Sequence, residues 1–217
     1  MNFKSRLTIG LIRIVMAYTL LYSVYWQITD RLAHNLFRPS EYFSYFTITS
    51  CLLAGAVLGY SGVAILRNQK ETKSLTLVRL TTAVSMVIVG VIYNALLANS
   101  APDPRDIGYA WPVLPNLIMH TYMPIIIFFE WLIFNTEFKI NLKSVFWVLL
   151  YPLAWLAFTI IRGLAKGWWP YWFLDPQYGI GSMLTWICVI TAFFVVLSII
   201  LLPVRQLASK LTSRWGI

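Results

Sequence analysis

Long apolar runs separated by short polar segments dominate the hydrophobic pattern of this chain. Each run is close to the roughly 20 residues that a helix needs to cross the hydrocarbon core of a bilayer. The runs predict six transmembrane helices, at residues 8–27, 41–62, 77–98, 113–134, 144–164 and 180–202. Helices are expected because lipid offers no partner to an unpaired backbone group at a strand edge. The chain is therefore predicted to be an all-α integral membrane protein with a single six-helix domain over residues 1–217.

Composition supports this class. Hydrophobic residues make up 59% of the 217 residues and charged residues 12%, whereas soluble domains carry about 25% charged residues. The net charge of +9 is interpreted as cytoplasmic loops held against anionic lipid head groups. No nucleic-acid partner is expected, because no basic run is interleaved with aromatic residues. The two cysteines, Cys51 and Cys188, fall in predicted helices without a CxxC pair or a Cys/His cluster, so neither a disulfide framework nor a structural metal site is expected.

The distribution of basic residues predicts the orientation. Twelve of the seventeen Lys and Arg residues lie on the side of the N-terminus: Lys4, Arg6, Arg13, Arg67, Lys70, Lys73, Arg79, Lys139, Lys143, Arg205, Lys210 and Arg214. The other five are Arg31, Arg38, Arg105, Arg162 and Lys166. The positive-inside rule then places both termini in the cytoplasm and loops 28–40, 99–112 and 165–179 outside. The expected location is a bacterial cytoplasmic membrane.

Thr47 and His120 are the candidate catalytic pair. Both enter the membrane from the same predicted side, each about two helical turns or roughly 9–12 Å deep. A threonine hydroxyl is a poor nucleophile without a base, and an imidazole with its ordinary pKa of about 6.5 is available in the neutral form to take the proton. An ionisable group at membrane depth is a functional-site hypothesis by default. The alternatives are a helix-packing stripe of Ser44, Thr47 and Cys51, and a histidine hydrogen-bonded to a neighbouring helix.

Three polar residues are candidates for supporting roles. Asn116, one turn before His120, is predicted to orient the imidazole with its amide, and Ser44 shares the face of Thr47. Asn94 either donates to a developing oxyanion or caps a helix bend. Pro124 has no N–H for the carbonyl of His120, so a free carbonyl is expected there.

Two charged residues within the predicted helices are expected to be structural. Glu130 lies about 15 Å from His120 along the helix axis, too far to orient it, and an interfacial or packing role is expected. Arg13 is predicted to extend its side chain to the membrane interface.

The loop after the fifth predicted helix is rich in aromatic residues and proline. Residues 161–176 contain Arg162, Trp168, Trp169 and Asp175. They suggest an interfacial or partly re-entrant lid over a substrate site, held shut by an Arg162–Asp175 ion pair, because irregular backbone at membrane depth requires protein or a cavity around it. The alternative is a simple aromatic anchor in the head-group region.

Three blocks of sequence resemble a known family. They are FSYFTITS at residues 43–50, NLIMHTYMPIIIFFEWLIF at 116–134, and YPLAWLAFTIIRG with GWWPYWFLDP within 151–176. Together they resemble the bacterial six-pass branch of the androgen-induced-protein superfamily, which includes the androgen-induced protein and the androgen-dependent regulator of tissue factor pathway inhibitor. The resemblance implies an intramembrane threonine hydrolase that cleaves fatty acid esters of hydroxy fatty acids, with Thr47 as nucleophile and His120 as base. Because the animal members differ around their threonine, Thr49 remains an alternative nucleophile.

The sequence thus favours an intramembrane lipid ester hydrolase that needs no cofactor and takes its substrate from the bilayer. No particular protein partner is indicated. One alternative is a non-catalytic bundle that binds a lipid or a protein partner, and a small-molecule transporter ranks third. A hydrolase predicts an apolar cavity that ends at Thr47 and His120, a binding bundle predicts a packed pair, and a transporter predicts a polar path to both faces.

Overall fold

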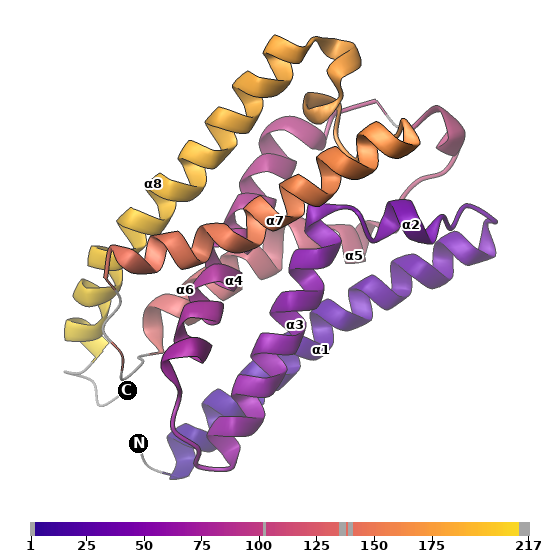
Figure 1. Ribbon diagram of the computed structural model, residues 1–217. Coiled ribbons are helices and arrows are strands. Elements are labelled where there is room, and N and C mark those ends of the chain that lie inside the picture. Colours follow the sequence, from indigo (N-terminus) through magenta and orange to yellow (C-terminus); the bar gives the residue numbers. More distant parts are fainter. Residues whose placement is uncertain (1–2, 102, 135–137, 139–140, 213–217) are drawn as a thin grey trace.

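The computed structural model is a bundle of long helices, and it describes residues 3–101, 103–134, 138 and 141–212, the last eight of them by backbone only (Figure 1). Six helices in this part of the chain are long and apolar enough to cross a membrane, which confirms the predicted number of spans. The described residues contain helices and turns but no strand. Their bounds are α1 (Phe3–Ala33), α2 (Pro39–Tyr42), α3 (Phe46–Leu66), α4 (Lys73–Ile92), η1 (Tyr93–Leu97), η2 (Pro104–Asp106), α5 (Val113–Leu117), η3 (Ile118–Tyr122), α6 (Met123–Ile133), α7 (Lys143–Lys166), η4 (Trp172–Leu174), η5 (Pro176–Tyr178) and α8 (Ile180–Thr212).

Helix α4 occupies the centre of the bundle. It packs against α3, α6, α7 and α8, and 61% of its most apolar stretch is buried. The corresponding fractions for α7 and α8 are 22% and 17%, so these two helices are peripheral. Helices α1 and α8 lie on opposite sides of the bundle (Figure 1). A space beside α4 that α7 and α8 enclose is therefore close to the apolar surface of the protein.

Helices α1 and α3 pack closely against each other. A side chain at Gly62 would place its Cβ atom 2.8 Å from the carbonyl oxygen of Gly10, so the two backbones touch where both residues are glycine. Small residues allow such contact between membrane helices, where dispersion and weak polar contacts replace the hydrophobic effect. The pair forms a rigid wall from which α3 presents its first turn.

A buried ionic cluster ties α1, α4 and α6 together near the end of the bundle where α1 begins. Glu130 accepts hydrogen bonds from Arg13 at 2.6 Å and from Arg79 at 2.8 Å, and Arg79 also binds Glu71 at 2.9 Å. Only 1% of Arg13 and 5% of Glu130 is exposed. The expected extension of Arg13 to the interface is thus wrong, because a carboxylate on α6 is available to it inside the bundle. We refer to these four residues as the Glu130 cluster.

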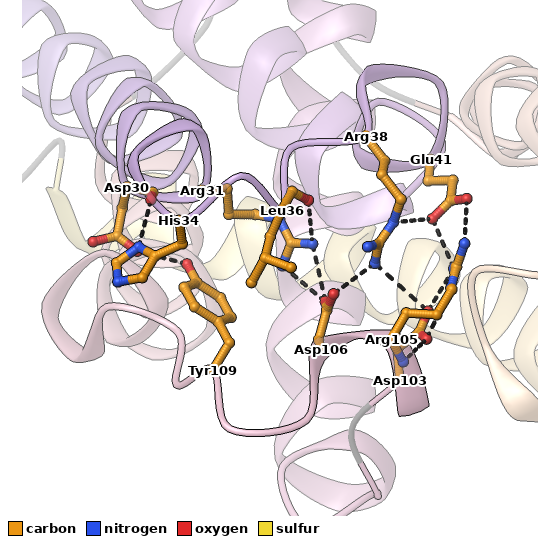
Figure 2. Close-up of polar contacts among 10 residues, drawn as sticks. All are labelled: Asp30, Arg31, His34, Leu36, Arg38, Glu41, Asp103, Arg105, Asp106 and Tyr109. Carbon is orange, nitrogen blue, oxygen red and sulfur yellow. Dashed lines mark hydrogen bonds and ion pairs between the residues drawn. The ribbon is translucent and has the colours of Figure 1, made fainter.

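A second ionic network joins the loops at the opposite end of the bundle (Figure 2). Asp106, buried in loop 98–112, binds Arg31 at the end of α1 at 2.9 Å and Arg38 before α2 at 2.7 Å. The network also includes Glu41, Asp103 and Arg105. These contacts fix α2 against loop 98–112, and α2 leads directly into the first turn of α3. We call this set the loop network.

Acidification is expected to loosen the loop network. The hydrogen bond from Arg105 holds the pKa of Asp103 below its ordinary value of 3.8, at about 2. A carboxylate with a lowered folded-state pKa stabilises the fold fully above its unfolded pKa, and this contribution disappears as the pH falls through the folded pKa. Because the Asp103 side chain is partly exposed and pairs with the exposed Arg105, screening reduces the effect to roughly 1 kcal/mol.

Amide hydrogen exchange of residues 103–109, corrected for the intrinsic rate, is therefore expected to accelerate as the pH falls from about 4 to about 2. The variant Arg105→Gln removes the cation that lowers this pKa, so most of the acceleration should be lost. An identical pH response in the variant would show that another group controls the loop.

Candidate functional site

Thr47 is the second residue of α3, and its buried side chain lines a cavity of about 80 Å³. The sequence predicted one helix over residues 41–62, but the structure interrupts it between α2 and α3. Two side chains explain the break by binding backbone groups that a continuous helix would use. Trp155 Nε1 donates to the Ser44 carbonyl at 3.0 Å, and the Phe46 N–H donates to the Tyr171 hydroxyl at 3.0 Å. Thr47 is consequently presented on the first turn of a new helix.

The lining of the cavity is mostly apolar. The cavity is bounded by α4, α7, α8 and the loop between the last two helices, with Val89, Leu153 and Ile190 as examples of the lining. The lining residues that carry a hydroxyl are Thr47, Tyr93, Tyr171 and Thr191. Since α7 and α8 are peripheral, the cavity lies between the core and the surface that faces lipid in a membrane-embedded bundle.

His120 lies in the π-helical turn η3. Its Nδ1 is 2.9 Å from the carbonyl oxygen of Asn116. A carbonyl only accepts, so this contact places the proton on Nδ1 and the lone pair on Nε2. The ring stacks on Tyr93, with centroids 3.7 Å apart and 22° between the planes. The imidazole is thus held as a tautomer whose Nε2 is basic.

The side-chain amides of Asn116 and Asn94 bind other partners than His120 Nδ1 and an oxyanion. Asn116 orients His120 through its backbone carbonyl, while its amide donates to the hydroxyl of Tyr93. The amide of Asn94 donates to the carbonyls of Gly90 at 2.8 Å and His120 at 3.0 Å. The latter is the carbonyl that Pro124 leaves without an N–H partner. Both amide hydrogens of Asn94 are engaged, so it caps the helix bend, and an oxyanion donor has to be sought elsewhere.

Thr47 and His120 are on neighbouring elements, because α3 packs against η3. Among the described residues, however, no hydrogen bond joins their side chains. Tyr93, whose ring covers His120, lines the cavity, whereas His120 is not among the lining residues. Transfer of the Thr47 proton to Nε2 therefore requires a bridging water or a closer approach in the substrate complex, as is common for catalytic hydrogen bonds.

Two other hydroxyls near the start of α3, those of Thr49 and Ser44, are engaged elsewhere. Thr49 Oγ1 donates to the carbonyl of Phe46 at 3.1 Å and accepts the Tyr151 hydroxyl at 3.0 Å. Ser44 Oγ donates to the Ser40 carbonyl at 2.6 Å. Neither residue lines the cavity. Of the hydroxyls considered from the sequence, that of Thr47 is the one placed in the cavity.

The loop between α7 and α8 forms part of the cavity wall. Trp168 packs edge-on against Tyr45, and the guanidinium of Arg162 lies 4.6 Å from the centre of the Trp168 ring. The expected Arg162–Asp175 ion pair is wrong, because the ion pairs of the described residues do not include it. Asp175 instead accepts the N–H of Gln177 at 2.9 Å, which caps η5.

Sequence reasoning missed the residues of this loop that reach the cavity. Tyr171, Phe173 and Leu174 line it, whereas the tryptophans singled out from the sequence, Trp168 and Trp169, do not. The composition of the loop identified it as a candidate segment. Which of its side chains face the cavity could not be predicted, because the backbone of an irregular loop has no regular period. Tyr93 and Trp155 were missed for the related reason that aromatic residues are abundant throughout the chain.

Enlarging Gly163 is expected to displace the loop. A Cβ atom at this position would lie 2.5 Å from the Trp169 ring, so Gly163→Leu forces the indole away from α7. The expected result is faster hydrogen exchange across residues 167–175. Gly181→Leu is the matched control, because a Cβ atom there meets nothing within 4 Å. Equal exchange in the two variants would mean that Trp169 does not hold the loop.

Comparisons with known proteins add no assignment: no family model, curated protein or solved structure matches this chain. The fold and site of the described residues thus define the class, a helical bundle with six helices of membrane-spanning length and a mostly apolar cavity whose lining includes Thr47.

Proposed function

We propose that this protein is an integral membrane hydrolase of lipid-like esters, with Thr47 as nucleophile and His120 as base. The observation that carries the proposal is the mostly apolar cavity whose lining includes Thr47. The apolar lining suits an acyl chain, whose ester carbonyl would lie beside Thr47. The basic Nε2 of His120 on the adjacent element supplies a proton acceptor. The resemblance of three sequence blocks to the androgen-induced-protein superfamily points to the same pair and to fatty acid esters of hydroxy fatty acids as substrates.

The reaction proceeds through an acyl-enzyme. Thr47 Oγ1 attacks the ester carbonyl carbon, and its proton moves to Nε2 of His120. The tetrahedral intermediate then breaks its bond to the alkoxide, which takes that proton from His120. Water attacks the acyl-threonine and gives a proton to His120, and this proton returns to Thr47 as the fatty acid leaves. The chemistry balances without a cofactor.

The proposal includes an orientation. With twelve of seventeen basic residues on the N-terminal side, both termini lie in the cytoplasm and the cavity lies in the outer half of a bacterial cytoplasmic membrane. Substrate then enters from the bilayer near α7 and α8, and water and the released products exchange at the outer surface.

A non-catalytic lipid-binding bundle is the second candidate. It is favoured by the lack of a direct hydrogen bond between the Thr47 and His120 side chains among the described residues. Such a protein would hold an acyl chain in the cavity without cleaving it.

Activity measurements on the purified protein in lipid nanodiscs separate the two functions. A hydrolase is expected to cleave members of a panel of fatty acyl esters, and a fluorophosphonate probe should modify Thr47, located by mass spectrometry. His120→Ala should abolish both results. Binding of a photoreactive fatty acid without any cleavage or labelling would replace the hydrolase by the binding bundle.

A further inference from the structure

Tyr171 lines the cavity, as Thr47 does. Its hydroxyl accepts the Phe46 N–H at 3.0 Å and also interacts with the side chain and backbone of Thr47. Its ring stacks on Phe173, with centroids 5.2 Å apart and 11° between the planes, and packs against Trp155. The hydroxyl is thus held beside the proposed nucleophile by its hydrogen bond and by the packing of the ring.

This hydroxyl is available as a hydrogen-bond donor. The Phe46 N–H uses one lone pair of the phenol oxygen, which leaves the O–H hydrogen for Thr47 or for a ligand in the cavity. Burial raises the pKa of Tyr171, so the phenol stays protonated at neutral pH. The Asn94 amide, which had been the candidate donor, is engaged with two carbonyls.

We propose that Tyr171 donates the principal hydrogen bond to the oxyanion that forms on the substrate carbonyl when Thr47 attacks. This inference rests on the proposed hydrolase function. As the bond between Thr47 Oγ1 and the carbonyl carbon forms, the electron pair of the C=O bond moves to oxygen, and the Tyr171 O–H turns to that oxygen.

Tyr171 keeps its proton throughout, since the proton of Thr47 goes to His120 and from there to the leaving alkoxide. A donor positioned before the reaction stabilises charge that appears only in the transition state, so it raises kcat more than it lowers KM. The lid loop therefore completes the site as well as covering it.

The test compares Tyr171→Phe with the matched control Tyr151→Phe. Both changes remove one phenol hydroxyl that binds a residue near the start of α3, but Tyr151 binds Thr49 and Ser50 and does not line the cavity. For esters that the wild type cleaves, Tyr171→Phe is expected to lower kcat by roughly 10²–10³-fold with little change in KM. Tyr151→Phe should stay within about threefold of the wild type, as expected for a hydroxyl outside the reaction.

The outcomes separate this inference from the proposed function. Loss of hydrolysis in Thr47→Ala with unchanged kcat in Tyr171→Phe overturns the role of Tyr171 alone. No hydrolysis by the wild type overturns both. If Tyr171→Phe fails to fold, 3,5-difluorotyrosine at position 171 keeps the ring and hydroxyl but ionises at lower pH. The alkaline fall of kcat should then move to lower pH, and an unmoved profile contradicts the proposal.

Discussion

Replacing Thr47 by alanine is expected to reduce ester hydrolysis by roughly 10³-fold or more, because the variant has no atom with which to form the acyl-enzyme. The substitution removes only a hydroxyl and a methyl group from the cavity lining, so substrate binding should survive. The expected result is a collapse of kcat with KM nearly unchanged, together with the loss of fluorophosphonate labelling at position 47. Both are measured on purified protein in nanodiscs.

Two neighbouring hydroxyls serve as controls. Thr49→Ala and Ser44→Ala each remove a hydroxyl near the start of α3 that binds a backbone carbonyl outside the cavity. Both variants should keep hydrolysis within a few-fold, and Thr47→Ser should keep part of it, since serine retains the nucleophilic oxygen. Loss of activity in Thr49→Ala with full activity in Thr47→Ala would transfer the nucleophile to Thr49.

Removing the carboxylate of Glu130 is expected to destabilise the fold by about 3–5 kcal/mol, because Arg13 then remains buried without an anion and Arg79 keeps only Glu71. Arg13 and Arg79 both bind the same carboxylate oxygen of Glu130. The variant Glu130→Met keeps much of the side-chain volume while it removes the charge. Unfolding in mixed detergent micelles, followed by circular dichroism, measures the change in free energy.

The control replaces the buried charges together. A triple variant in which Arg13, Arg79 and Glu130 are all methionine has no unpaired buried cation, and Glu71 keeps its hydrogen bond from Thr76. Replacing buried ion pairs by apolar residues is often neutral. We expect the triple variant to recover most of the stability lost in Glu130→Met. If Glu130→Met alone is as stable as the wild type, water must reach the cluster and solvate the two arginines.

The six apolar helices and the local relation of Asn116, His120 and Pro124 were predictable, because the order of residues along the chain determines them. An apolar run of about 20 residues can satisfy its backbone in lipid only as a helix, so six runs predicted six helices. Asn116 and His120 are four residues apart, so they share a face of a helix. Pro124 has no backbone N–H, so it cannot donate a hydrogen bond to the His120 carbonyl. The structure supplies what binds that carbonyl, the amide of Asn94 from α4.

The details of the site depended on contacts between residues far apart in the chain. The break before Thr47 requires Trp155 from α7 and Tyr171 from the following loop, both more than a hundred residues away. No sequence pattern within residues 41–50 predicts hydrogen bonds to such distant residues. The same applies to Arg13, because only the tertiary structure shows that Glu130 lies within reach of its guanidinium.

The sequence by itself determined the class of this protein, its six apolar helices and the choice of Thr47 and His120 as candidates. Those conclusions depend on transfer free energies and on helical periodicity, which act residue by residue. The tertiary structure decided which hydroxyl lines the cavity, which nitrogen of His120 is basic, and that Tyr171 lies beside Thr47. These depend on how helices pack and on the path of an irregular loop, where side chains distant in sequence exclude one another from the same space.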